Sequence, residues 1–141
     1  MNKEISKRIE QIAIELTNEV SVVETPGELN STQKLYDIFA EMNYYKENPE
    51  HLFFVEVQND KLGRKSVVAL LKGKKGNSNK TVIMIGHTDT VGISDYGNLK
   101  DYANKPYELT EKFKEIAHTL SDEVRKDLES GDYLFGRGLF D

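Results

Sequence analysis

The chain of 141 residues has the size of one domain, and its 38% hydrophobic and 30% charged residues are typical of a globular protein with a hydrated surface. Its net charge of −5 disfavours general binding to nucleic acid, which needs a basic face. No apolar run approaches the length of a membrane span, and the absence of cysteine excludes disulfides and thiolate metal sites. We therefore expect a cytoplasmic protein that binds neither nucleic acid nor membranes.

Two amphipathic helices are predicted in the N-terminal part of the chain. The first covers residues 3–19, and its apolar face consists of residues at helical spacing, Ile5, Ile9, Ile12 and Leu16. Residues 20–28 then form a loop that ends in Pro-Gly turn chemistry. The second helix covers residues 30–42, and three polar residues are candidates for its N-cap: Asn30, Ser31 and Thr32.

Three strand-like segments follow, at residues 51–57, 66–71 and 80–85. A polar turn separates the first two, so they predict a β-hairpin. The third segment is continuously apolar from residue 82 to 85, as central strands covered on both faces are. Because helices flank this strand cluster on both sides in the sequence, the pattern predicts a three-layer α/β fold.

The C-terminal third begins with a long polar loop over residues 92–106. Long ordered loops in compact domains tend to be functional. Short charged helices are predicted over residues 108–116 and 121–128, and Gly131 should end the second one. Residues 133–135 could form a short strand before the final glycine turn.

The candidate chemistry lies directly after the apolar segment, at His87 and Asp89. In an α/β fold, side chains at the end of a strand are commonly those that form the site. Residues i and i+2 point to the same side there, so Asp89 could hold the other ring nitrogen of a metal-bound His87 or lie beside the metal itself. The alternative is an ordinary loop histidine next to an Asp in an Asx turn or at an N-cap.

A second candidate segment ends the sequence and carries Gly136, Gly138 and Asp141. Two glycines let the backbone turn tightly and approach a site closely, and the carboxylate of Asp141 could bridge two cations. The alternative is an ordinary turn. Without cysteine, a metal site here must use His and carboxylate ligands, which favours zinc, manganese or cobalt.

These two segments together resemble the M20 metallopeptidases, the aminoacylase and carboxypeptidase-like group. Residues 86–91, Gly-His-Thr-Asp-Thr-Val, resemble that family's GHxDxV signature, and residues 136–141, Gly-Arg-Gly-Leu-Phe-Asp, resemble its GRGxxD. Residues 104–107 are similar to its DPF-like segment. The resemblance covers essentially the whole chain, and residues 87–109 look closest to the arginine-utilisation branch.

The resemblance implies a pair of divalent metal ions, usually zinc, with cobalt or manganese as alternatives. In this reading His87 ligates one metal, Asp141 bridges both, and Asp89 orients the ring of His87. The implied fold is the N-terminal part of a zinc-peptidase-like catalytic domain, a three-layer sandwich with a mixed, mostly parallel central sheet. We expect residues 1–141 to form one truncated catalytic domain that lacks the lid or dimerisation domain.

The parent enzyme implied by the resemblance cleaves amide or peptide bonds of amino-acid derivatives in arginine or general amino-acid catabolism. Its substrate would be a small peptide or an acyl-amino acid, and we expect the parent to be a homodimer. Gly92 departs from the family, which commonly has proline there. The family's Glu-Glu pair, later acidic ligand and final His are not in this sequence, so we expect the chain alone to be inactive and to bind metal weakly.

Two other readings stay open. The chain could be a non-catalytic binding or assembly module that keeps the peptidase scaffold, or a protein that binds a single metal ion. A reading frame that continues past codon 141 with a Glu-Glu pair favours the enzyme, and a stop codon favours the module. The remaining histidines, His51 and His118, are predicted to be surface or strand-edge residues.

Overall fold

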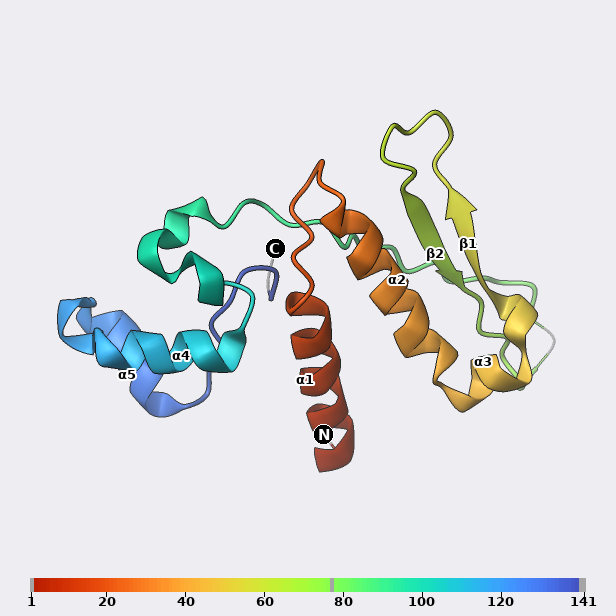
Figure 1. Cartoon of the computed structure of the whole chain (residues 1–141). Coiled ribbons are helices and arrows are strands. Elements are labelled where there is room, and N and C mark those ends of the chain that lie inside the picture. The colour runs from red at the N-terminus through yellow and green to blue at the C-terminus, as the bar shows by residue number, and fades with distance from the viewer. Residues whose placement is uncertain (1, 77, 140–141) are drawn as a thin grey trace.

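The computed structural model describes residues 2–76 and 78–139, and Asp141, the predicted bridging ligand, lies outside them. Figure 1 shows helix α1 (Lys3–Thr17) in the middle of the molecule. On one side of it lie α2 (Gly27–Ala40), α3 (Asn43–Glu47) and the hairpin of β1 (Leu52–Glu56) and β2 (Lys65–Ala69). On the other side lie α4 (Pro106–Glu115) and α5 (Asp122–Ser130).

The N-terminal helix confirms the first predicted helix, although it ends slightly earlier. Its N-cap is Asn2, whose side chain accepts a hydrogen bond from the backbone N–H of Glu4. The far end is pinned by Asn104, whose side-chain Nδ2 donates to the carbonyl of Thr17 at 3.1 Å. Two residues of its apolar face, Ile5 and Ile9, remain more than half exposed. The helix is therefore covered mainly near its C-terminal end.

Helix α2 begins earlier than predicted, and the expected polar N-cap is wrong. Its cap is Pro26, which has helical φ and ψ and makes no side-chain capping hydrogen bond. Ser31 and Thr32 lie inside the helix, where both hydroxyls donate to the carbonyl of Glu28. At Gly27 a Cβ atom would come within 1.9 Å of the Val20 carbonyl oxygen, so only glycine allows the loop to approach the helix start this closely.

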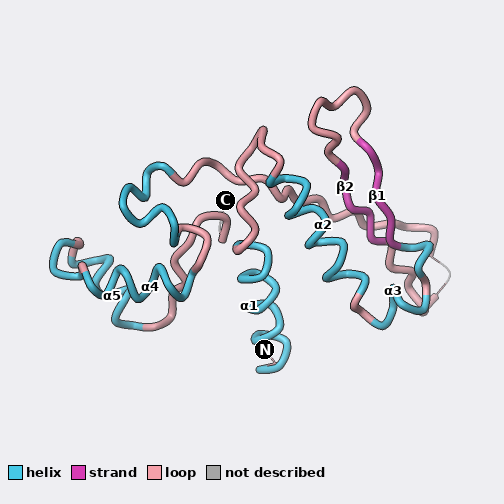
Figure 2. The backbone as a smooth tube through the Cα atoms, in the orientation of Figure 1, coloured by secondary structure: helices cyan, strands magenta, loops and turns pink. Residues whose placement is uncertain are grey.

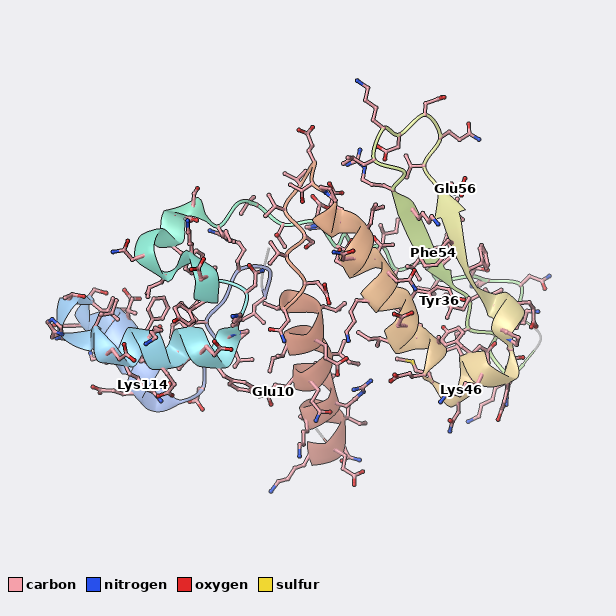
Figure 3. All side chains as sticks on the ribbon, in the orientation of Figure 1. Glu10, Tyr36, Lys46, Phe54, Glu56 and Lys114 are labelled. Atoms are coloured by element: carbon pink, nitrogen blue, oxygen red, sulfur yellow. The ribbon has the colours of Figure 1, made fainter. Side chains whose placement is uncertain are left out.

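The predicted hairpin is confirmed as an antiparallel pair, in which Leu52 lies opposite Ala69 and Glu56 opposite Lys65. Helix α2 covers one face of it, where the rings of Tyr36 and Phe54 stack with centroids 4.5 Å apart (Figure 3). On the opposite face the neighbouring strand residues Phe53 and Val55 remain exposed. The hairpin thus has a packed face and an open apolar face.

Two small clusters of buried apolar residues hold the chain together on either side of α1. One joins α2, α3 and the hairpin through Ile38, Tyr45 and Leu52. The other lies around α4 and α5 and contains Ala103, Leu109 and Leu128.

The segment predicted as a central strand, residues 80–85, is the main difference from the sequence analysis. In the described structure it is a loop, drawn in pink between β2 and the middle of the molecule in Figure 2. Val82 is 87% exposed and Met84 is 93% exposed. A strand needs a neighbour to accept its backbone hydrogen bonds, and in the described residues β1 and β2 pair only with each other. The three-layer sandwich with a mostly parallel sheet therefore stays a prediction.

The C-terminal third confirms both predicted helices. A 3-10 helix, η2 (Ser94–Tyr102), occupies most of the predicted long loop and is kinked at Gly97. Helix α5 is capped by the Ser121 hydroxyl and ends at Gly131 in the left-handed conformation. The strand predicted at residues 133–135 is not formed. Across the part of the chain that the structure describes, no helix has the length and apolar character needed to cross a membrane.

Candidate functional site

The two segments that carry the sequence motifs lie around one small hollow of about 160 Å³. His87 to Thr90 form one wall, and Arg137 and Gly138 form another. The end of α1 and the loop after it complete the lining with Thr17, Glu19 and Ser21. The two motif segments, which are far apart in the sequence, therefore lie beside the same hollow.

The segment that bears His87 is held by a loop instead of a sheet. Thr90 donates its backbone N–H to the carbonyl of Ser21 at 2.9 Å, and its own carbonyl accepts the N–H of Val23 at 2.9 Å. These two bonds form an isolated parallel bridge between Val22 and Thr90. The loop of residues 20–26 thus fixes the backbone just after the His-x-Asp motif.

Asp89 engages one ring nitrogen of His87 in two ways. The Nδ1 atom of His87 lies 3.1 Å from the backbone carbonyl oxygen of Asp89 and 3.4 Å from its carboxylate Oδ1. Both side chains are substantially exposed, at 60% and 40%. This contact orients the imidazole through Nδ1.

Gly138 makes the contact between the two motifs possible. Its φ of +81° is left-handed, and a Cβ atom there would lie 2.8 Å from the Cγ2 atom of Thr90. A side chain at this position would push the Gly-Arg-Gly turn away from the His-x-Asp segment. The close backbone approach predicted for the glycine pair is therefore seen at Gly138.

Comparison with known proteins gives two curated relatives. The chain is 36% identical over 136 residues, 96% of its length, to "Protein RocB" of Bacillus subtilis (strain 168). It is also 36% identical over 141 residues to the "Uncharacterized protein YqjN" of the same organism. This chain is similar to RocB along nearly its whole length.

The chain spans about a quarter of the length of these relatives, 24% of RocB and 25% of YqjN. No model of a known protein family matches the chain, and no solved structure matches it. The two comparisons thus place this chain beside one part of larger proteins.

Arg137 anchors the Gly-Arg-Gly turn to the rest of the molecule. Its backbone N–H donates to the carbonyl of Ala103 at 2.7 Å. Its guanidinium Nη2 donates to both carboxylate oxygens of Asp95, at 2.7 and 2.5 Å, and the guanidinium Cζ lies 5.1 Å from the ring centre of Tyr96. The hydrogen bond from Arg137 lowers the pKa of the Asp95 carboxyl below its ordinary value of 3.8. Sequence reasoning missed this pair, because nothing in the loop pattern marks Asp95.

The residues that could hold a metal form an incomplete set. Within residues 2–76 and 78–139, no three His, Cys, Asp or Glu side chains come together as a metal-binding group. His87 with Asp89 supplies one imidazole and the carboxylate that orients it. Asp141 lies outside the described residues, so its place relative to His87 stays a prediction.

The other two histidines differ from each other. His118 is exposed, as predicted. His51 lies directly before β1, which agrees with the strand-edge half of the prediction, but it is buried and not at the surface. Its Nδ1 atom lies 3.0 Å from the Tyr44 hydroxyl, and the two rings stack. The Tyr44 hydroxyl also accepts a hydrogen bond from the backbone N–H of Lys72. Tyr44 thus joins α3 to the chain after β2, and His51 packs against it.

A second, larger depression of about 580 Å³ lies between α1, α4 and the segment after α5. Three of its charged residues are already engaged, since the Tyr107 hydroxyl donates to Glu10 and Lys114 pairs with Glu111. Figure 3 shows Glu10 on α1 and Lys114 on α4. This depression contains no histidine, and the motif residues do not line it.

Proposed function

We propose that this chain supplies the N-terminal part of the catalytic domain of an M20-type dinuclear metallohydrolase. The activity is cleavage of amide or peptide bonds in amino-acid derivatives by the complete enzyme. The similarity to RocB over almost the whole chain supports a relative of that length, and the paired motifs around one hollow support the metal chemistry. The chain by itself is inactive in this proposal, because its residues include no candidate for the general base.

The observation that carries the proposal is the contact between Asp89 and the Nδ1 atom of His87. An imidazole that ligates a metal through one nitrogen commonly donates its other N–H to a carboxylate or carbonyl, which fixes the tautomer and ring orientation. Asp89 offers both kinds of acceptor at hydrogen-bonding or near hydrogen-bonding distance.

The residues of this chain would supply only some of the ligands that two metal ions need. His87 would hold one ion, Asp141 would bridge it to a second ion, and Asp89 would orient His87. When bound, such ions polarise the substrate carbonyl and lower the pKa of water. The remaining ligands would come from parts of a RocB-length protein that this chain does not span. Zinc is the expected metal, with cobalt and manganese compatible with the same donors.

The fold proposed for the complete domain is the three-layer sandwich with a mixed, mostly parallel sheet. Two features support it. The hairpin has α2 on one face and the exposed Phe53 and Val55 on the other, which suits a second covering layer. The exposed apolar run at residues 82–85 suits a strand that pairs and becomes buried in the complete sheet.

For the substrate we propose a small peptide or acyl-amino acid, handled by a cytoplasmic, homodimeric enzyme of arginine utilisation. The support is the likeness of residues 87–109 to that branch of the family, together with the similarity to RocB.

Metal binding by the chain tests the role of His87. Zinc or cobalt is titrated into the wild-type chain and into His87→Ala and His118→Ala variants, and bound metal is measured after equilibrium dialysis. His118 is the matched control because it is an exposed histidine far from the hollow. We expect weak binding that is lost in the His87 variant and kept in the His118 variant. Equal metal content in all three chains would exclude a ligand role for His87.

The hydrolase activity is tested on a RocB-length protein that contains this sequence. Treatment with EDTA or dipicolinate should abolish hydrolysis of acyl-amino acids, and zinc or cobalt should restore it. Activity that survives complete metal removal would refute the metallohydrolase. A full-length protein that binds metal and hydrolyses no amide would favour the non-catalytic module.

A further inference from the structure

A buried carboxylate links the tip of the β-hairpin to the loop beside the candidate site. Glu28 lies in the first turn of α2, and its side chain is only 11% exposed. A carboxylate this buried needs partners. It has two: the Nη1 atom of Arg64, 3.4 Å from each oxygen, and the backbone N–H of Glu24, 2.5 Å from Oε1.

Arg64 is itself fixed in place by the turn between β1 and β2. Its Nε and Nη2 atoms donate to the Asp60 carboxylate at 2.9 and 2.5 Å, and its backbone N–H donates to the same group at 2.8 Å. In Figure 1 this turn and the start of α2 lie at the same end of the hairpin. The guanidinium therefore joins a rigid turn to the helix across 36 positions of sequence.

On the other side of Glu28, the backbone of Glu24 is held in an unusual conformation. Its φ is +62°, a left-handed value that non-glycine residues rarely adopt. In this conformation its N–H points at the Glu28 carboxylate. Glu24 lies inside a turn that is closed by Thr25, whose hydroxyl and N–H both donate to the Val22 carbonyl. The Glu28 carboxylate thus stabilises the shape of the loop.

The same loop holds the backbone after the His-x-Asp motif. Val23 donates its N–H to the carbonyl of Thr90, and Thr90 donates its own N–H to Ser21. A continuous path of hydrogen bonds and short backbone links therefore runs from the hairpin tip to the residue after Asp89. Arg64, where the path begins, lies outside the candidate site, because it does not line the hollow.

We propose that Arg64 is a positioning residue for the segment of His87 and Asp89, and that it acts through Glu28 and the loop of residues 20–26. This inference deepens the proposed function, because it takes His87 and Asp89 as the working residues. Arg64 contacts neither of them. Its effect is to hold the Glu28 carboxylate in place, so that the loop presents Ser21 and Val23 to Thr90.

Amide hydrogen exchange measured by NMR on the whole chain tests the path. In Arg64→Met, the amides of Val23 and Thr90 should exchange at least about tenfold faster, as expected when a local structure opens more often. The amide of Leu109, which donates to the Lys105 carbonyl in α4, should keep its rate and reports that the chain remains folded. Arg64→Lys, which keeps the charge, should restore part of the protection.

Two further variants sharpen the result. Glu28→Gln keeps an acceptor for the Glu24 N–H and loses the charge, so it should speed the same two amides, and the double variant with Arg64→Met should add little. Arg125→Met is the matched control, because it breaks the exposed ion pair with Asp122 in α5. It should leave Val23 and Thr90 unchanged.

Two results would overturn the inference. Unchanged exchange at Thr90 in Arg64→Met would mean that the path ends before the motif. A parallel rise at Leu109 and Thr90 would show a global loss of stability with no specific coupling. Both are independent of metal binding, so failure of the His87 titration would refute the proposed function and leave this coupling to be judged separately.

Discussion

Replacing Gly138 with alanine is the sharpest test of how the two motif segments meet. The new Cβ atom would lie 2.8 Å from the Thr90 Cγ2 atom, well inside ordinary carbon contact, and φ at this position is +81°. The left-handed conformation costs a non-glycine residue about 1–2 kcal/mol. Overpacking against Thr90 adds about 1–3 kcal/mol, so Gly138→Ala should destabilise the chain by about 2–5 kcal/mol.

Gly131→Ala separates these two contributions. Gly131 has a similar φ of +71°, and among the described residues nothing lies within 4 Å of a Cβ atom built there. It should therefore show the conformational cost of about 1–2 kcal/mol without the clash. Both variants are measured by urea unfolding followed by far-UV circular dichroism, with the Thr90 amide shift as a local readout.

Thr90→Ser completes a double-mutant cycle with Gly138→Ala. Serine lacks the Cγ2 methyl that meets the new Cβ atom, so the double variant should recover about 1–3 kcal/mol relative to the sum of the single variants. Equal costs for the alanines at 131 and 138 would refute the close approach. Strict additivity in the cycle would refute Thr90 as the group that Gly138 accommodates.

Three other predictions concern charge and exposed apolar surface. The hydrogen bond from Arg64 lowers the pKa of Asp60 from 3.8 to about 2, so their pairing stabilises the fold above pH 3.8 and is lost as pH falls to about 2. Asp60→Asn should remove that acid dependence from urea unfolding, and an unchanged dependence would contradict the pairing. Arg137→Met should raise the pKa of Asp95 towards 3.8 in a carboxyl ¹³C titration, and no change would exclude Arg137 as the cause. Serine at all four positions 82–85 should reduce self-association in sedimentation velocity, because exposed apolar side chains leave water on association, and a monomeric wild-type chain would contradict this.

The helices could be predicted because their signals are local. The apolar spacing of the first helix and the Ser121 and Gly131 ends of α5 are read directly from neighbouring residues. The start of α2 was misplaced because polar residues that are good caps also bond back to carbonyls inside a helix, as Ser31 and Thr32 do.

The predicted strand at residues 82–85, which is a loop in the structure, shows the limit of what a local sequence pattern can predict. Its apolar run is typical of a buried strand, so the pattern indicates that the segment could form one. A strand forms only when a neighbouring strand accepts and donates its backbone hydrogen bonds. The prediction of the hairpin is confirmed because its first strand pairs with the next strand along the chain. A sequence pattern therefore predicts hairpins more securely than it predicts strands that pair across long distances.

For the candidate site, the sequence predicted the contacts that depend on spacing. His87 meets Asp89 because the two are close in sequence, and Gly138 allows the close approach that paired glycines suggest. It did not predict the contacts that depend on tertiary packing. The pairs of Arg137 with Asp95 and Arg64 with Glu28 are among many that 19 basic and 24 acidic residues allow, and no spacing rule selects them.

The loop conformation of residues 82–85 shows that the contact between His87 and Asp89 does not depend on a strand before it. The prediction treated the strand as the element that delivers His87, yet His87 and Asp89 are already in contact while that strand is a loop. What fixes the motif here is its bridge to the loop at Ser21 and Val23. The orientation of the imidazole therefore depends on loop contacts within this chain, whereas burial of the apolar segment depends on a strand that the described residues do not provide. If the complete sheet forms in a RocB-length protein, it should bury residues 82–85 and leave the contact between His87 and Asp89 as it is.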